Sequence, residues 1–187
     1  MKTAILLHGT QSSSNGGWLQ WLKAQLEQKE FVVWVPDLPN ADYPSLIEWT
    51  DYILDNCPFE INQDTTLIGH SSGAVAVLVL AQDFTHKVHQ IISVGVYKDL
   101  EYLHDVVNFH ANDRIFDIPF NFDKIKQNCN NIVFIHSDDD PYCPLSHAEF
   151  LSKKTLGKLV VMPGQGHFNL DKSPEYNKFP ALLDQLS

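Results

Sequence analysis

Six short apolar runs, spread along the whole chain, are the feature that most restricts the fold. They are rich in β-branched and aliphatic residues and are continuous, without alternating polar positions. Strands with this composition are buried on both faces, as in a parallel sheet that is covered by helices. The runs predict strands at residues 4–7, 31–35, 65–68, 88–94, 131–135 and 158–162.

Segments with helical spacing of their apolar residues lie between these runs and after the last one. They cover residues 18–28, 45–56, 72–82, 145–153 and 176–186. The alternation of strand and helix predicts a doubly wound α/β sheet. Ser45 and Glu48, three residues apart, indicate a capping box at the start of the second helix. Residues 97–130 fit neither pattern, and we expect a connection of this length to act as a lid or another functional loop.

Composition and charge narrow the class of protein. With 187 residues and no internal repeat or linker, residues 1–187 are expected to form a single domain. The 23 acidic and 13 basic residues give a formal net charge of −10, which argues against nucleic acid or a membrane surface as a partner. The three cysteines have no paired or metal-binding spacing, and the N-terminal apolar run is too short for a signal segment. We therefore expect a cytoplasmic protein.

A G-x-S-x-G pattern, GHSSG at residues 69–73, lies between a predicted strand and a predicted helix. It places Ser71 on a sharp turn above the sheet, where the flanking glycines let the backbone pack closely. The backbone N–H of Ser72, at the helix start, can then face an anion that forms at Ser71. Because the pattern also occurs in ordinary turns, a catalytic role for Ser71 requires a base and an acid elsewhere.

Both groups follow at the ends of later predicted strands. His167 lies in a glycine-rich loop after the last strand, and residues 138–140 are three aspartates directly after the strand before it. We expect the imidazole to reach Ser71 and one aspartate to orient the imidazole. The order Ser, Asp, His is that of α/β-hydrolases. A His-Gly dipeptide after the first strand supplies a second oxyanion donor, which we assign to the backbone N–H of Thr10.

The motifs HGT, GHSSG, DDDPYCP and GQGHF thus follow successive strands, and the chain also has a Trp-rich first helix and the segment PDLPN. Together they resemble the small serine hydrolases that include the retinoblastoma-binding-protein-9 family. The resemblance implies a minimal α/β-hydrolase with a six-stranded parallel sheet of order 2-1-3-4-5-6, helices on both faces and no separate cap domain. It also implies carboxylesterase-like activity. The family spacing of an acid four residues before a proline selects Asp140, with Pro144, as the acid.

We therefore expect a serine hydrolase that cleaves small acyl esters through an acyl-enzyme, with Ser71, Asp140 and His167 as the triad and no metal or cofactor. The N–H groups of Thr10 and Ser72 form the oxyanion hole. Without a cap, the pocket is expected to be shallow and to suit short acyl groups. Two alternatives remain: a catalytically silent hydrolase fold that binds a protein, or the same machinery used as a peptidase or thioesterase. A metal site at the three aspartates explains neither His167 nor the oxyanion loop.

Several neighbouring residues have structural interpretations. We expect His8 to shape the oxyanion loop, His70 to pack beside the nucleophile and Cys143 to be a packed thiol. Asp138 and Asp139 are expected at the surface or in loop caps. The aromatic residues of the long connection could equally form an acyl pocket or a small local core; they are Tyr97, Tyr102, Phe109, Phe116, Phe120 and Phe122.

Overall fold

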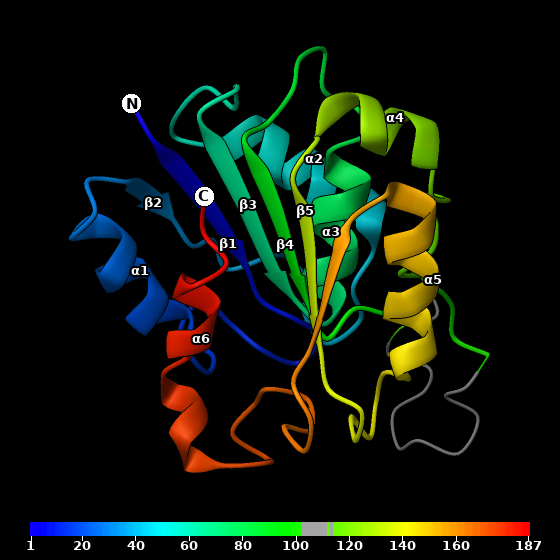
Figure 1. Ribbon diagram of the computed structural model, residues 1–187. Coiled ribbons are helices and arrows are strands. Elements are labelled where there is room, and N and C mark those ends of the chain that lie inside the picture. The colour runs from blue at the N-terminus through cyan, green and yellow to red at the C-terminus, as the bar shows by residue number, and fades with distance from the viewer. Residues whose placement is uncertain (102–111, 113) are drawn as a thin grey trace.

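The computed structural model contains a six-stranded, all-parallel sheet of order β2-β1-β3-β4-β5-β6 (Figure 1). It describes residues 1–101, 112 and 114–187. The predicted strand order is confirmed. The strands are β1 (Thr3–Leu7), β2 (Val32–Trp34), β3 (Thr65–His70), β4 (Gln90–Val94), β5 (Ile132–His136) and β6 (Lys158–Val161).

The register of the central strands brings their carboxyl ends to one edge of the sheet. Leu7 of β1 pairs with Gly69 of β3, and His70 pairs with Val94 of β4. Val94 in turn pairs with Ile135 of β5. The residues that directly follow these strands are therefore neighbours at this edge, where ligands bind in open α/β sheets.

Helices cover both faces of the sheet and enclose two hydrophobic cores (Figure 1). One core is covered by α2 (Leu46–Asn56), α3 (Ser72–Leu80), α4 (Phe122–Asn128) and α5 (Leu145–Thr155). The other is covered by α1 (Leu19–Glu27) and α6 (Pro180–Leu183). Successive strand residues point to opposite faces, so Ile5 enters the first core and Leu6 the second. Burial on both sides explains why the apolar runs of the central strands β1, β3, β4 and β5 are continuous.

The C-terminal segment differs from the prediction of one helix over residues 176–186. A 3-10 helix, η3 (Pro174–Asn177), is followed by the separate helix α6. Pro180 disfavours the helical conformation for the residue before it, and Phe179 accordingly has φ −143° and ψ 72°. The apolar spacing is still used, because Tyr176, Phe179 and Leu182 all pack in the second core.

Two of the helices that cover the first core, α4 and α2, also differ in part from the sequence analysis. Helix α4 was not predicted because its seven residues are too few to show a clear period. At the start of α2, Ser45 Oγ accepts from the N–H of Glu48 at 3.4 Å, as a capping box requires. The Glu48 carboxylate instead accepts from Asn40 at 2.7 Å and from Arg114 at 3.0 Å, so the reciprocal half of the box is replaced by longer-range bonds.

The described aromatic residues of the long connection form a row of ring contacts, with centroids 5.7–6.0 Å apart. The members of the row from the long connection pack against the first core, and Phe150 of α5 ends the row, which favours the local-core interpretation over an acyl pocket. Two aromatic residues of the prediction, Tyr102 and Phe109, lie outside the described residues, as does much of the expected lid. The row consists of Tyr97, Phe116, Phe120, Phe122 and Phe150.

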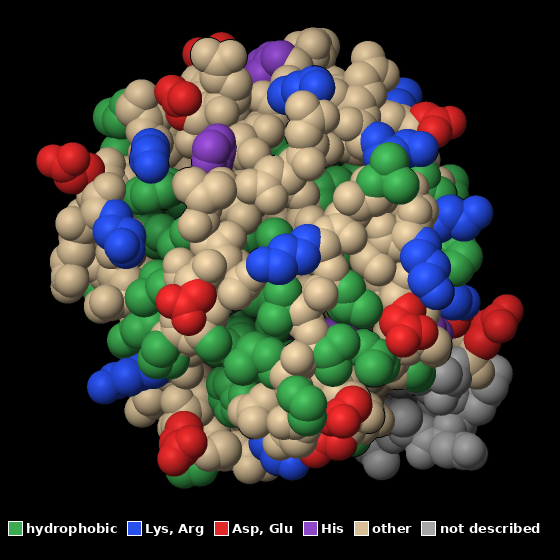
Figure 2. Space-filling view, in the orientation of Figure 1, with side chains coloured by type: hydrophobic (Ala, Val, Ile, Leu, Met, Phe, Trp, Pro, Cys, Tyr) green, Lys and Arg blue, Asp and Glu red, His purple; other side chains and the backbone are tan. Residues whose placement is uncertain are grey.

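The surface carries charges of both signs. On the face seen in Figure 2, lysine and arginine side chains are interspersed with acidic ones and do not gather in one patch. Within the part of the chain that the structure describes, the helices are too short or too polar to cross a membrane.

Candidate active site

Ser71 occupies a strained turn between β3 and α3. Its φ of 56° and ψ of −120° lie outside the regions that residues with a side chain ordinarily adopt. The turn is tight, because a methyl group on Gly69 would lie 2.1 Å from the carbonyl oxygen of Gly73. The N–H of Ser71 donates to the carbonyl of Val94 at 2.9 Å, which ties the turn to the end of β4. This is the geometry of a nucleophile elbow, which presents a serine at the end of the sheet.

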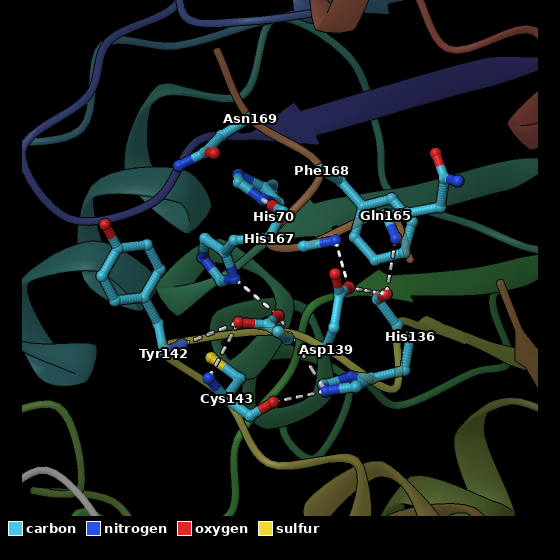
Figure 3. Close-up of polar contacts among 12 residues, drawn as sticks. His70, His136, Asp139, Tyr142, Cys143, Gln165, His167, Phe168 and Asn169 are labelled. Carbon is cyan, nitrogen blue, oxygen red and sulfur yellow. Dashed lines mark hydrogen bonds and ion pairs between the residues drawn. The ribbon is translucent and has the colours of Figure 1, made fainter. Parts of the chain in front are cut away.

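His167 and Asp140 are joined by a hydrogen bond between two largely buried side chains, drawn as the dashed line from the ring of the labelled His167 in Figure 3. His167 Nδ1 donates to Asp140 Oδ2 at 2.8 Å, and the two side chains are 6% and 0% exposed. The second carboxylate oxygen, Oδ1, accepts from the backbone N–H groups of Tyr142 at 2.9 Å and Cys143 at 3.0 Å. With its proton on Nδ1, the neutral imidazole has Nε2 available to accept a proton.

All three consecutive aspartates bind the loop that carries His167. Each uses a carboxylate oxygen to accept a hydrogen bond from a different residue of that loop, at distances of 2.6–2.9 Å. The expectation that the first two cap loops fits these bonds. The pairs are Asp138 with Gly164, Asp139 with Gly166, and Asp140 with His167.

The ionised carboxylate of Asp139 is stabilised by hydrogen bonds and by an ion pair with Lys172. Hydrogen bonds from Ser137, from the N–H of Gly166 and from Lys172 lower the pKa of its carboxyl group to about 2. Its second oxygen lies 2.9 Å from Lys172 Nζ, an ion pair that is about two-fifths exposed on each side. Asp139 therefore stays ionised and holds the loop, while Asp140 faces the imidazole.

Ser71 and His167 both lie next to the turn that follows β4, and the hydrogen bonds of the residues that the structure describes include none between these two side chains. Ser71 binds the carbonyl of Val94, and a methyl group on the next residue, Gly95, would lie 3.1 Å from His167 Cε1 and 3.6 Å from Asp140 Oδ2. Catalytic hydrogen bonds often tighten only when substrate binds.

Gly95 was missed by the sequence analysis. Its φ of +60° favours glycine, and its lack of a side chain leaves space for the imidazole. A glycine directly after a buried strand was the available signal.

Thr10 and Ser72, the two assigned oxyanion donors, are side by side, with 2.6 Å between their hydroxyl oxygens. His8 holds the loop that carries Thr10. Its Nε2 accepts from the N–H of Leu38 at 3.0 Å, so the proton is on Nδ1, which donates to the carbonyl of Gly9 at 2.8 Å. Burial lowers the pKa of His8, which keeps the ring neutral. This is the loop-shaping arrangement that we expected of His8.

His70 lies beside His167, where it contacts both the imidazole ring and the backbone of that residue (Figure 3). Its Nε2 donates to the carbonyl oxygen of His167 at 2.7 Å, and the two ring centroids are 4.7 Å apart. Trp18 packs edge-on against His70 at 5.8 Å. Burial lowers the pKa of His70 to about 3. His70 thus has the packing role that we expected, and it also fixes the backbone of His167.

Cys143 and His136 form a second layer behind the carboxylate. His136 is fully buried, and its Nε2 donates to the carbonyl of Cys143 at 2.7 Å, while the N–H of Cys143 donates to Asp140. Among the described residues, one group could share a metal ion, with its potential ligand atoms within 4.8 Å of one another: Asp140, Cys143 and His167. A cation there would displace the hydrogen bond between Asp140 and His167, so we interpret the group as part of a hydrolytic site.

The geometry can be set beside known families. Residues 4–187 match the family model described as "Serine hydrolase". The chain belongs to the serine hydrolase family. This serine hydrolase is 30% identical over 157 residues to "Serine hydrolase RBBP9" of Rattus norvegicus, covering 81% of this chain and 78% of the relative. It is also 26% identical over 189 residues to the putative hydrolase YdeN of Bacillus subtilis (strain 168), covering 100% and 95% of the two chains.

Solved structures agree with this assignment. The ydeN gene product of B. subtilis superimposes on the serine hydrolase with a TM-score of 0.84 at 25% identity, covering 98% of this chain and 96% of the other. Est1E from Butyrivibrio proteoclasticus, with ferulic acid bound, has a TM-score of 0.70 at 16% identity and covers 99% and 89%. This second likeness concerns the fold. The predicted family, the α/β-hydrolase fold and the assignment as a hydrolase are confirmed.

Proposed function

We propose that this serine hydrolase cleaves small acyl esters, as a carboxylesterase does, with Ser71, His167 and Asp140 as its catalytic triad. The observation that carries the proposal is the buried 2.8 Å hydrogen bond between His167 and Asp140 beside a serine held in an elbow. The order of the three residues along the chain is the order found in α/β-hydrolases.

In the acylation step, Ser71 Oγ attacks the carbonyl carbon of the ester while His167 Nε2 takes the hydroxyl proton. Asp140 keeps the imidazole in the tautomer that can accept this proton and stabilises the cation that forms. The oxyanion accepts hydrogen bonds from the backbone N–H groups of Thr10 and Ser72, each worth about 3 kcal/mol in comparable sites. His167 then gives the proton to the leaving alcohol, and Ser71 carries the acyl group.

In the deacylation step, His167 removes a proton from a water molecule that attacks the acyl-enzyme. Collapse of the second oxyanion releases the carboxylic acid and returns the proton to Ser71. A short acyl chain suits a hydrolase of this size in which the residues that the structure describes form no separate cap. The cysteines are all free, which supports a reducing compartment, and we propose that the enzyme works in the cytoplasm.

Labelling with a fluorophosphonate probe tests the nucleophile. The folded wild-type enzyme is expected to form a covalent adduct at Ser71, located by peptide mass spectrometry, and Ser71→Ala is expected to form none. A folded wild-type protein that takes no label would overturn the proposal in favour of a protein-binding module.

Turnover of matched substrates tests the bond that is cleaved. Short p-nitrophenyl esters, acyl thioesters and aminoacyl amides are compared by kcat/KM. The ester is expected to be the best substrate, because its leaving group needs the least assistance from His167. A higher kcat/KM for the thioester or the amide would replace the esterase assignment with a thioesterase or a peptidase.

A further inference from the structure

The side chains of the two assigned oxyanion-donor residues and of two further residues form one continuous hydrogen-bonded chain, which we call the hydroxyl chain. Tyr97 OH lies 2.7 Å from Ser72 Oγ. Ser72 Oγ lies 2.6 Å from Thr10 Oγ1, which in turn lies 2.6 Å from Asn112 Oδ1. The members come from the loop after β1, from the first residue of α3 and, in the case of Tyr97 and Asn112, from the long connection that follows β4. Segments distant in sequence thus meet at one point.

The hydroxyl chain has one direction. Asn112 Oδ1 is an acceptor only, so the hydroxyl of Thr10 donates to it. With its single proton used, Thr10 Oγ1 accepts from Ser72, and Ser72 Oγ accepts from Tyr97. Burial raises the pKa of the Tyr97 phenol, so it remains protonated as the first donor. Further contacts of Asn112 Oδ1 with Ser72 and Tyr97, at 3.4 and 3.5 Å, are too long to compete.

The proposed mechanism uses the backbone N–H groups of Thr10 and Ser72 and needs neither hydroxyl. Yet these two side chains are in direct contact, and Ser72 is 1% and Tyr97 3% exposed. An oxyanion hole stabilises a transition state only if its donors are fixed in advance, and a misplacement of about 1 Å can cost about 10²-fold in rate. A contact that joins the two donor residues is therefore well placed to fix their separation.

We propose that the hydroxyl chain sets the oxyanion hole, with Tyr97, Ser72 and Thr10 as positioning residues. Their bonds hold the loop after β1 against the N-terminus of α3, so that the two N–H donors converge on one point. Asn112 ends the hydroxyl chain and connects the segment after β4 to the same point. The inference rests on the proposed hydrolytic function, because it concerns the same site.

Steady-state kinetics of Thr10→Val and Tyr97→Phe test the inference, since each removes one hydroxyl group from the hydroxyl chain. We expect kcat to fall by about tenfold to a hundredfold while KM changes by less than about twofold, because only transition-state binding is affected. Thr10→Ser, which keeps the hydroxyl, is expected to restore most of kcat. The kcat of the double variant should be about as low as that of the more impaired single variant, because both changes interrupt one network.

A trifluoromethyl ketone gives a readout that a general loss of packing would not move. Ser71 Oγ adds to its carbonyl carbon, the hydroxyl proton passes to His167, and the resulting oxyanion occupies the hole. The inhibition constant is expected to rise in each variant by the factor by which kcat/KM falls.

Thr155→Val serves as the matched control. Its buried hydroxyl donates to the carbonyl of Leu151 at 2.8 Å in the last turn of α5, away from the site. Thermal unfolding of all variants accompanies the kinetics.

Three results would overturn the inference in a folded, active enzyme. They are an unchanged kcat in both variants, a rise of KM at constant kcat, or an inhibition constant that does not follow kcat/KM. A wild-type enzyme without turnover and without fluorophosphonate labelling would instead refute the proposed function, and the inference with it.

Discussion

Replacing Asp140 with asparagine should stop the proposed mechanism while leaving the fold intact. In the structure, Asp140 Oδ1 accepts from the N–H groups of Tyr142 and Cys143, and Oδ2 accepts from His167 Nδ1. After Asp140→Asn the carbonyl oxygen keeps the first position, because only an oxygen can accept those two bonds. The amide NH₂ then faces His167 and forces Nδ1 to act as an acceptor. The imidazole proton moves to Nε2, the atom that must take the proton of Ser71.

The wrong tautomer costs about 10⁴-fold in kcat in a Ser-His-Asp triad, or about 5 kcal/mol of transition-state stabilisation. We expect a loss of this order for Asp140→Asn, measured by initial rates on p-nitrophenyl acetate, with a fluorophosphonate labelling rate that falls in parallel. Asp139→Asn is the matched control, because its side-chain oxygen still accepts from Gly166, and it should keep kcat within about tenfold. An Asp140→Asn enzyme within tenfold of wild type, or a greater loss in Asp139→Asn, would refute the assignment of the acid.

Two further changes probe the surroundings of His167. Gly95→Ala should lower the free energy of unfolding by at least about 1–2 kcal/mol, from the positive φ alone, and also reduce kcat, because its methyl group would lie 3.1 Å from the imidazole. Gly164 has a φ of +72°, and an added methyl group would meet no atom within 4 Å. Gly164→Ala should therefore lower the free energy of unfolding, measured by urea unfolding, and leave kcat unchanged. If both variants lost the same fraction of kcat, the steric argument for Gly95 would be contradicted. The pKa of His70, about 3 against 6.5, means that its neutral form stabilises the fold fully above pH 6.5 and progressively less as pH falls toward 3, by up to about 1.4 kcal/mol per pH unit. His70→Gln, which keeps a donor for the carbonyl of His167, should flatten the stability curve over that range, and parallel curves would show the shift to be wrong.

The sheet was predictable because burial on both faces leaves a simple signal in the four central strands, and the partly exposed edge strands β2 and β6 are apolar as well. Continuous apolar runs located every strand, and the strand order followed from the family resemblance. Most helices were predictable where their period lasted two turns or more, whereas α3 is buried at every residue and has no such period. At the C-terminus the apolar spacing was correct, but the backbone chemistry of Pro180 overrode it. The seven residues of α4 gave too short a period to separate from a loop.

The candidate site could be proposed from the sequence only where one residue carries its own signal. GHSSG and the glycine-rich loop located Ser71 and His167, whereas Asp140 could be separated from Asp139 only through the spacing to Pro144. The supporting contacts depend on how β1, β3 and β4 align, and no local pattern reports that alignment. Gly95 and the hydroxyl chain are of this kind: each residue is ordinary in sequence and acquires its role from its neighbours in space.

The pairing of the three aspartates with three residues of the histidine loop couples the lengths of two segments more than twenty residues apart. Inserting or deleting a single residue in either segment would put every one of these bonds out of step at once. Engineers who wish to graft the proposed acid and base onto another scaffold must therefore transplant both segments together.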